Sequence, residues 1–186
     1  MPLAGQTSTV LALEIGVAQS VVRGRGAWRG PGLTANVHIP RTHNVDAGVE
    51  AGFFDLGVQR EEIQELDPAY GPVVRRERAE QQFGWVGLAA RYHVTSGGVR
   101  PVLSAGVAVY GFNQLERIEE RTPDGALVRQ GTVEFVDLEY TPGLSLGAGV
   151  QWPLAQHLLG TVRLRAHGAF QGGFPVLVLS AGVGYR

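Results

Sequence analysis

Residues 141–154 read TPGLSLGAGVQWPL, residues 158–170 read LLGTVRLRAHGAF, and residues 175–186 read PVLVLSAGVGYR. In each segment every second residue is apolar, and the residues between are mostly glycine, small polar residues, histidine or arginine. Successive side chains of a β-strand point to opposite faces of the sheet, so this period of two predicts three strands.

The composition of the polar face favours a membrane barrel over a soluble one. Alternation occurs in both kinds of barrel, but a membrane barrel turns its apolar face outward and keeps its polar groups in the lumen. Glycine with charges such as Arg163 and Arg165 suits a crowded interior, whereas a water-facing surface is usually rich in long lysine and glutamate side chains. The segments therefore indicate strands with a lipid-facing apolar side.

The whole composition narrows the class of protein further. A length of 186 residues predicts one domain over residues 1–186. The net charge of −1 gives no reason to expect nucleic acid, and the absence of cysteine excludes disulfides and thiolate metal sites. All sixteen basic residues are arginine, which is typical of a GC-rich genome.

The start of the chain shows no targeting signal. MPLAGQTSTV has no basic residue, and Glu14 interrupts the apolar run that follows it, so no signal peptide is predicted in this sequence. Residues 141–162 carry no formal charge over a length that could span a bilayer, but their glycines, prolines and period of two argue against a transmembrane helix.

The alternation continues upstream and predicts eight strands in all. Residues 23–32 (RGRGAWRGPG) are expected to form a loop, and residues 59–74 a second one with a short helical stretch, because Ile63 and Leu66 are three apart. Short turns are expected at residues 40–44, 95–98 and 154–157, and at 123–125. The predicted strands are residues 7–22, 33–39, 45–58, 75–94, a strand from 99, a strand from 133 into 141–154, and strands within 158–170 and 175–186.

Short turns alternate with longer loops along this even number of strands, which predicts an all-β, antiparallel up-and-down transmembrane β-barrel. A strand needs only about 9–11 residues to cross a membrane, yet the fifth and sixth strands together extend from Val99 to Leu154. We therefore expect an extended extracellular β-hairpin over about 112–138. Residues 75–82 could join it as a third strand, and its open edge could receive a partner's strand.

RPVLSAGVAVY (residues 100–110), TPGLSLGAGVQWPL and LVLSAGVGYR (residues 177–186) resemble strands of small outer-membrane barrels of the OmpA-transmembrane-domain and OmpX type. GVGYR is similar to the signal that ends such proteins, although they usually finish on an aromatic residue and this chain finishes on Arg186. The resemblance implies a location in the bacterial outer membrane, and the arginine-only composition points within that family to a thermophile member.

The inward faces of the predicted strands carry an unusual set of charges. An eight-stranded barrel is only wide enough for its own side chains, and buried charges must pair, so we expect a salt-bridge network that fills the lumen. His38 and His167 face the same space. An alternative is a narrow ion pore in which the pairs exchange partners. The expected network consists of Glu14, Asp46, Glu50, Arg91, Glu139, Arg163 and Arg165.

Other candidate sites are weaker. Tyr92, Trp152 and Tyr185 fall near the same end of their strands, where an interfacial aromatic girdle belongs. No metal site is expected, since the acidic residues Glu61, Glu62, Glu65 and Asp67 lack a recognised ligand spacing and suit a solvated surface. Catalysis is not expected either. His167 and Ser180 could approach each other, but no nucleophile motif accompanies them.

These observations predict a monomeric outer-membrane barrel with a structural, adhesive or surface-interaction role and no open pore. We expect no enzymatic activity and no cofactor. Expected partners are outer-membrane lipid, lipopolysaccharide or detergent, and an extracellular protein at the hairpin. The alternatives are a narrow gated ion channel of porin-like type and a soluble, lipocalin-like ligand-binding barrel, which needs an apolar lumen and a polar exterior.

Overall fold

The computed structural model of the chain describes residues 9–22, 26–95, 98–135, 140–170 and 175–186. No helix occurs among these residues, and so none that could cross a membrane. The strands are β1 (Val10–Val22), β2 (Gly26–Pro40), β3 (Val45–Asp67), β4 (Gly71–His93), β5 (Arg100–Arg121), β6 (Leu127–Phe135), β7 (Thr141–Pro153), β8 (Leu158–Ala169) and β9 (Val176–Tyr185).

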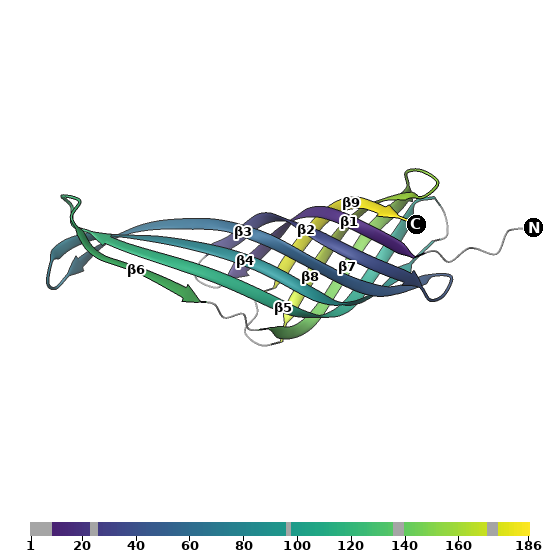
Figure 1. Cartoon of the computed structure of the whole chain (residues 1–186), viewed down its shortest axis with the longest axis horizontal. Coiled ribbons are helices and arrows are strands. Elements are labelled where there is room, and N and C mark those ends of the chain that lie inside the picture. Colours follow the sequence, from purple (N-terminus) through teal and green to yellow (C-terminus); the bar gives the residue numbers. More distant parts are fainter. Residues whose placement is uncertain (1–8, 23–25, 96–97, 136–139, 171–174) are drawn as a thin grey trace, which may run out of the picture.

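Eight of these strands close into a ring (Figure 1). Each pairs antiparallel with its neighbours in the order β1, β2, β3, β4, β5, β7, β8 and β9, and β9 pairs with β1 to complete the barrel. The predicted eight-stranded antiparallel barrel is therefore confirmed. The strand predicted from 133 into 141–154 corresponds to the end of β6 and to β7, which pair with successive parts of β5: β6 with its projecting part and β7 with its part in the ring. The predicted junction at residues 136–139 lies outside the described residues.

The outer surface of the barrel is apolar. The large side chains that alternate outward along the strands are about 40% exposed or more, for example Leu13, Ile15, Leu88 and Leu146, with Leu146 at 67%. The residues between them face the lumen and are buried. Soluble proteins rarely expose an apolar surface of this extent, and hydrocarbon is the medium that it suits.

The outer halves of β3, β4 and β5, together with β6, form a four-stranded sheet that projects from one end of the ring. We call it the projecting sheet, and it comprises residues 58–67, 71–82, 113–121 and 127–135. Figure 1 shows it at the opposite end of the molecule from the C-terminus and the start of β1. The prediction that residues 75–82 join the hairpin is confirmed, because they pair with β5 from Glu120 to Asn113.

Glycines mark the bend and the tips of this sheet. A register shift in β3 between Asp55 and Val58 contains Gly57 with φ 89°, a conformation that favours glycine, and the Gly57 N–H donates to the Asp55 carboxylate at 3.0 Å. At the predicted turn over 123–125, Gly125 has φ 91° and its N–H donates to the Thr122 carbonyl. The Thr122 hydroxyl donates to Asp124 and lowers the pKa of that exposed carboxyl.

Two sequence-based expectations for loops are wrong. Residues 59–67 are β-strand rather than a helical loop, because in the projecting sheet both faces carry charged residues and no apolar alternation marks the strand. Residues 26–32 belong to β2, although RGRGAWRGPG has the composition of a loop. The glycines there fit a narrow barrel, since a Cβ on Gly30 would overlap the Asp55 carbonyl of β3.

Candidate functional site

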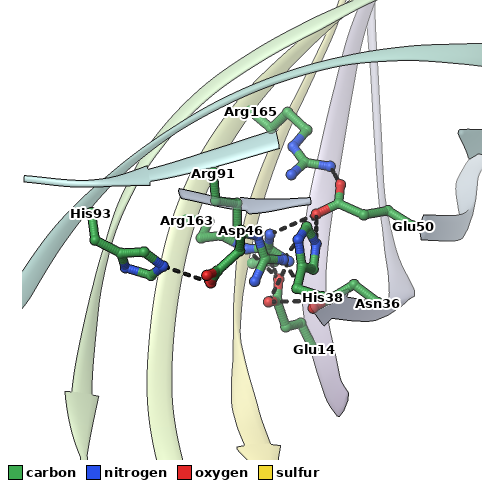
Figure 2. A network of polar contacts seen from close by, with 10 residues as sticks. Glu14, Asn36, His38, Asp46, Glu50, Arg91, His93, Arg163 and Arg165 are labelled. Atoms are coloured by element: carbon green, nitrogen blue, oxygen red, sulfur yellow. Dashed lines mark hydrogen bonds and ion pairs between the residues drawn. The ribbon is translucent and has the colours of Figure 1, made fainter. Parts of the chain in front are cut away.

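The lumen holds a network of buried ion pairs at its centre (Figure 2). Glu14 on β1, 1% exposed, accepts hydrogen bonds from Nε and Nη2 of Arg163 on β8, the Nε contact at 3.0 Å. The Ser180 hydroxyl donates to Glu14 Oε2 at 2.7 Å, and Asn36 donates to Oε1 at 3.4 Å. Both oxygens of this carboxylate therefore have partners from several strands.

Glu50 on β3 is the second centre of the network. Arg91 donates to Glu50 Oε1 at 2.9 Å, Arg163 donates to the same oxygen at 3.1 Å, and Arg165 donates to Oε2. His38 Nε2 lies 3.0 Å from Oε1. Because β3 and β8 lie on opposite sides of the eight-membered ring, the contacts from Arg163 and Arg165 to Glu50 cross the whole lumen.

Asp46 of the expected set pairs with a histidine rather than with the arginines of this centre. Asp46 contacts His93 Nε2 at 2.7 Å, and these residues lie at the start of β3 and the end of β4, beside the short turns. Glu139 lies outside the residues that the structure describes. The five remaining residues, Glu14, Glu50, Arg91, Arg163 and Arg165, are brought together, and Asn36 and Ser180 are additional polar partners outside the expected set.

A layer of aromatic side chains fills the lumen on the side of the projecting sheet. Trp85 on β4 stacks on Phe54 at 5.7 Å between ring centroids and lies 5.3 Å from Phe83. Phe83 in turn stacks on Tyr110 at 5.9 Å. His167 packs against Trp85 at 4.4 Å, and its Nδ1 lies 3.3 Å from the Tyr110 hydroxyl. The expectation of a polar lumen thus omitted this layer, although Phe83 and Trp85 share the inward parity of Arg91.

The structure keeps apart the two residues considered for catalysis. Ser180 is in register with Arg163, and His167 is in register with Val176, which places the two side chains about 13 Å apart along the strands. The Ser180 hydroxyl donates to Glu14 rather than to a histidine. This geometry offers no nucleophile and base within hydrogen-bond reach.

Aromatic residues mark both rims of the apolar belt. The predicted residues Tyr92, Trp152 and Tyr185 lie on outward-facing positions at the end with the short turns, and Tyr92 and Tyr185 are 46% and 60% exposed. A second set at the other rim was not predicted. It consists of Phe53, Tyr140 and Phe170, which are 54%, 71% and 65% exposed.

The four weak metal candidates lie spread along β3 in the projecting sheet. Glu62 pairs with Arg76 at 3.0 Å, Glu65 lies 3.9 Å from Arg75, and Asp67 accepts the N–H groups of Ala69 and Tyr70 at the turn. Over the described part of the chain, no three histidine, aspartate or glutamate residues lie close enough together to hold a metal ion.

An apolar outer belt with aromatic rims and a lumen filled by ion pairs define a small eight-stranded transmembrane β-barrel of the outer-membrane type. The soluble, lipocalin-like alternative is wrong, because it requires the opposite distribution of polar and apolar residues.

Comparisons with solved structures agree with this class. Neisserial surface protein A (NspA) aligns with a TM-score of 0.59 and 15% identity over 96% of both chains. The N-terminal β-barrel domain of Pseudomonas aeruginosa OprF aligns with a TM-score of 0.50 and 16% identity over 98% of both chains.

No protein-family model and no curated protein sequence matches the chain. The likeness at these identities concerns the fold. The thermophile origin indicated by the arginine-only composition stays a prediction.

Proposed function

We propose that the chain is a monomeric integral outer-membrane protein whose barrel is a closed anchor for a surface-exposed interaction sheet. The layered lumen is the observation that carries this proposal. The cross-lumen contacts from Arg163 and Arg165 to Glu50 form one layer, and the aromatic layer around Trp85 forms a second. Two filled layers in series support a structural or adhesive role over an open pore.

The orientation follows from the unequal ends of the barrel. In outer-membrane barrels the short turns face the periplasm and the longer connections face the outside. The turns at residues 41–44 and 154–157 lie at the end opposite the projecting sheet. This arrangement supports an extracellular position for the projecting sheet.

The projecting sheet has features of an interaction surface. Among the described residues, β6 pairs along one side only, with β5, and residues 58–67 of β3 pair along one side only, with β4. Each edge offers unpaired backbone groups to an added strand. An extracellular protein partner would bind here by adding a strand to the sheet.

Single-channel recording tests the closed state. Purified full-length chain, shown to be folded by a shift in gel migration between unboiled and boiled samples, is added to a planar lipid bilayer. We expect no stepwise conductance. Regular unit steps from the unmodified protein would overturn the closed anchor and favour the narrow ion channel.

A further inference from the structure

We propose that the outer face of β4 and β5 carries a binding site for an outer-leaflet glycolipid that bears phosphate groups on its sugar headgroup. This inference rests on the proposed function, because it requires the projecting sheet to stand outside the cell. Three features follow one another along these two strands, from the membrane outward: an apolar notch, a pair of amides and a row of arginines.

The notch lies at the rim of the apolar belt. Gly84 and Gly111 are cross-strand partners, and Phe53 on β3 is the other partner of Gly84. Together with Val86, Val109 and Tyr140 they line a groove of about 290 Å³ on the outer surface. An apolar groove at this depth suits an acyl chain, because each buried methylene group contributes about 0.8 kcal/mol to membrane anchoring.

Packing of the backbone does not require glycine at residue 84. A Cβ there would lie 3.4 Å from the Gly52 carbonyl oxygen and 3.7 Å from Phe53 Cδ2, which are ordinary contact distances. The lumen-facing Gly48 differs, because a Cβ there would overlap the Val37 carbonyl oxygen. The absence of a side chain at residue 84 therefore leaves open space on the lipid-facing surface.

The amide pair lies one outward-facing step beyond the notch. Gln82 and Asn113 are cross-strand partners, and Asn113 Oδ1 is buried without a hydrogen-bond partner among the described residues. Buried polar atoms usually have a partner, so this oxygen is a free acceptor beside the notch. A sugar hydroxyl of a bound glycolipid would supply the donor.

The arginine row crosses three strands of the projecting sheet. Arg60, Arg78 and Arg117 are in register on β3, β4 and β5. They line a groove of about 500 Å³ whose other charged residues are Arg76, Glu61, Glu62, Glu77 and Glu119. Arg78 contacts Glu80 at 2.7 Å, whereas Arg60 and Arg117 form no ion pair with any residue that the structure describes. Like charges directly opposite each other destabilise a sheet, and the ion pairs of the described residues leave the guanidinium groups of Arg60 and Arg117 available to an anion. Guanidinium groups bind phosphate oxygens in pairs.

The distance between the apolar notch and the arginine row indicates which class of lipid could reach both. Arg78 lies six positions before Gly84 in the sequence, which is about 20 Å along a strand at about 3.3 Å per residue. With a strand tilt of about 40°, the arginines stand about 15 Å above the notch. A phosphate joined directly to the glycerol of a phospholipid stays beside the acyl chains, whereas phosphates on an oligosaccharide headgroup reach this height.

A binding measurement with matched variants tests the site. The full chain is reconstituted in phosphatidylcholine nanodiscs and titrated with fluorescent lipopolysaccharide whose core sugars are phosphorylated. We expect the triple change Arg60→Gln, Arg78→Gln, Arg117→Gln to weaken binding about tenfold or more, because the charge-assisted contacts to phosphate are lost. Gly84→Leu fills the notch and should weaken binding several-fold. Arg129→Gln and Gly168→Leu are the controls, since Arg129 is 71% exposed outside the row and Gly168 has open space around its Cβ position.

Three ligand arms separate the possible sources of the anion. Dephosphorylated lipopolysaccharide and phosphatidylglycerol should both compete weakly. If free polyphosphate binds as tightly as the glycolipid and Gly84→Leu has no effect, the row is a site for a soluble polyanion and the proposal fails. Equal competition by phosphatidylglycerol, or unchanged binding by the triple variant, also overturns it. The bilayer recording is independent of these outcomes, so failure of this site leaves the closed anchor standing.

Discussion

Glu50 is the lumen residue on which three arginines from two strands converge. Its carboxylate, 2% exposed, accepts hydrogen bonds from Arg91, Arg163 and Arg165. Its inward position follows from strand parity in the sequence, but the choice of partners does not. Parity places a side chain on a face, whereas the pairing of Arg163 with both Glu14 and Glu50 depends on the closure of the ring.

Substitution of Glu50 by glutamine should destabilise the barrel strongly. The change leaves buried arginines without their shared counter-charge, a loss typically of about 3–5 kcal/mol in the free energy of unfolding. Urea unfolding of the folded protein in lipid vesicles measures it. Glu62→Gln is the matched control, because Glu62 is 56% exposed in its pair with Arg76, and it should change stability by less than about 1 kcal/mol. Equal effects of the two changes would show that the lumen network contributes no more than a surface pair.

Some of the many glycines are needed because neighbouring strands pack too closely for a side chain. A Cβ on Gly48 would overlap the Val37 carbonyl oxygen and lie 2.8 Å from the His38 Cα, both on the backbone of β2. We expect Gly48→Ala to destabilise the barrel by about 1–3 kcal/mol, as overpacking does elsewhere. Gly168→Ala meets nothing within 4 Å and should be close to neutral in the same unfolding assay. A neutral Gly48→Ala would contradict the close approach of β2 and β3.

At the scale of elements, the period of two predicted most of the barrel strands but missed residues 26–32 of β2 and the strands of the projecting sheet. Strands that face lipid on one side and the lumen on the other alternate in hydrophobicity, so β7, β8 and β9 could be predicted from the sequence. Residues 59–67 have solvent on both faces, so no such pattern marks them. Ile63 and Leu66 have a helical spacing in the sequence, but in the structure both belong to β3 and pair with β4.

The part of the projecting sheet that β5 and β6 form should be dispensable for folding of the barrel. Replacing residues 113–135 by a short glycine–serine linker removes the outer half of β5 and β6, but it leaves Phe112 and the aromatic layer in place. We expect the shortened protein to keep the shift in gel migration on boiling. Loss of that shift would mean that the sheet contributes to assembly.

At the scale of the molecule, the exterior of the barrel decides its environment. Leu164 and Leu179 are cross-strand partners in the middle of the belt and are 53% and 55% exposed. Leu164→Asp and Leu179→Asp should each reduce insertion into lipid vesicles. An acid in the lipid-facing band is unfavourable, although less so than the about 2–4 kcal/mol found for arginine or lysine at the midplane. Gln130→Asp in the projecting sheet is the control and should insert normally. Unaltered insertion of the leucine variants would show that this face does not meet hydrocarbon.

The arrangement of the lumen into two layers exceeded what the sequence could predict. The charged layer was expected because buried acids and arginines must pair. The aromatic layer depends on how far each strand continues before it leaves the ring. Because residues 23–32 were expected to form a loop, Trp28 was not predicted to face the lumen, although it is 2% exposed in that layer. The sequence therefore predicted which face of a strand each side chain occupies better than it predicted where each strand begins and ends.

Labelling of single cysteines tests the central claim most directly, namely that lipid surrounds the barrel while its lumen is closed to water. The natural sequence contains no cysteine, so each added thiol is the only one. Leu146 and Ser145 are adjacent on β7 and face opposite sides, with exposures of 67% and 7%. In vesicles, we expect a probe at Leu146→Cys to be quenched by lipid-borne quenchers, and Ser145→Cys to react slowly with a membrane-impermeant thiol reagent. Rapid aqueous labelling at Ser145→Cys would reveal an open lumen, and rapid aqueous labelling at both positions would contradict a membrane barrel.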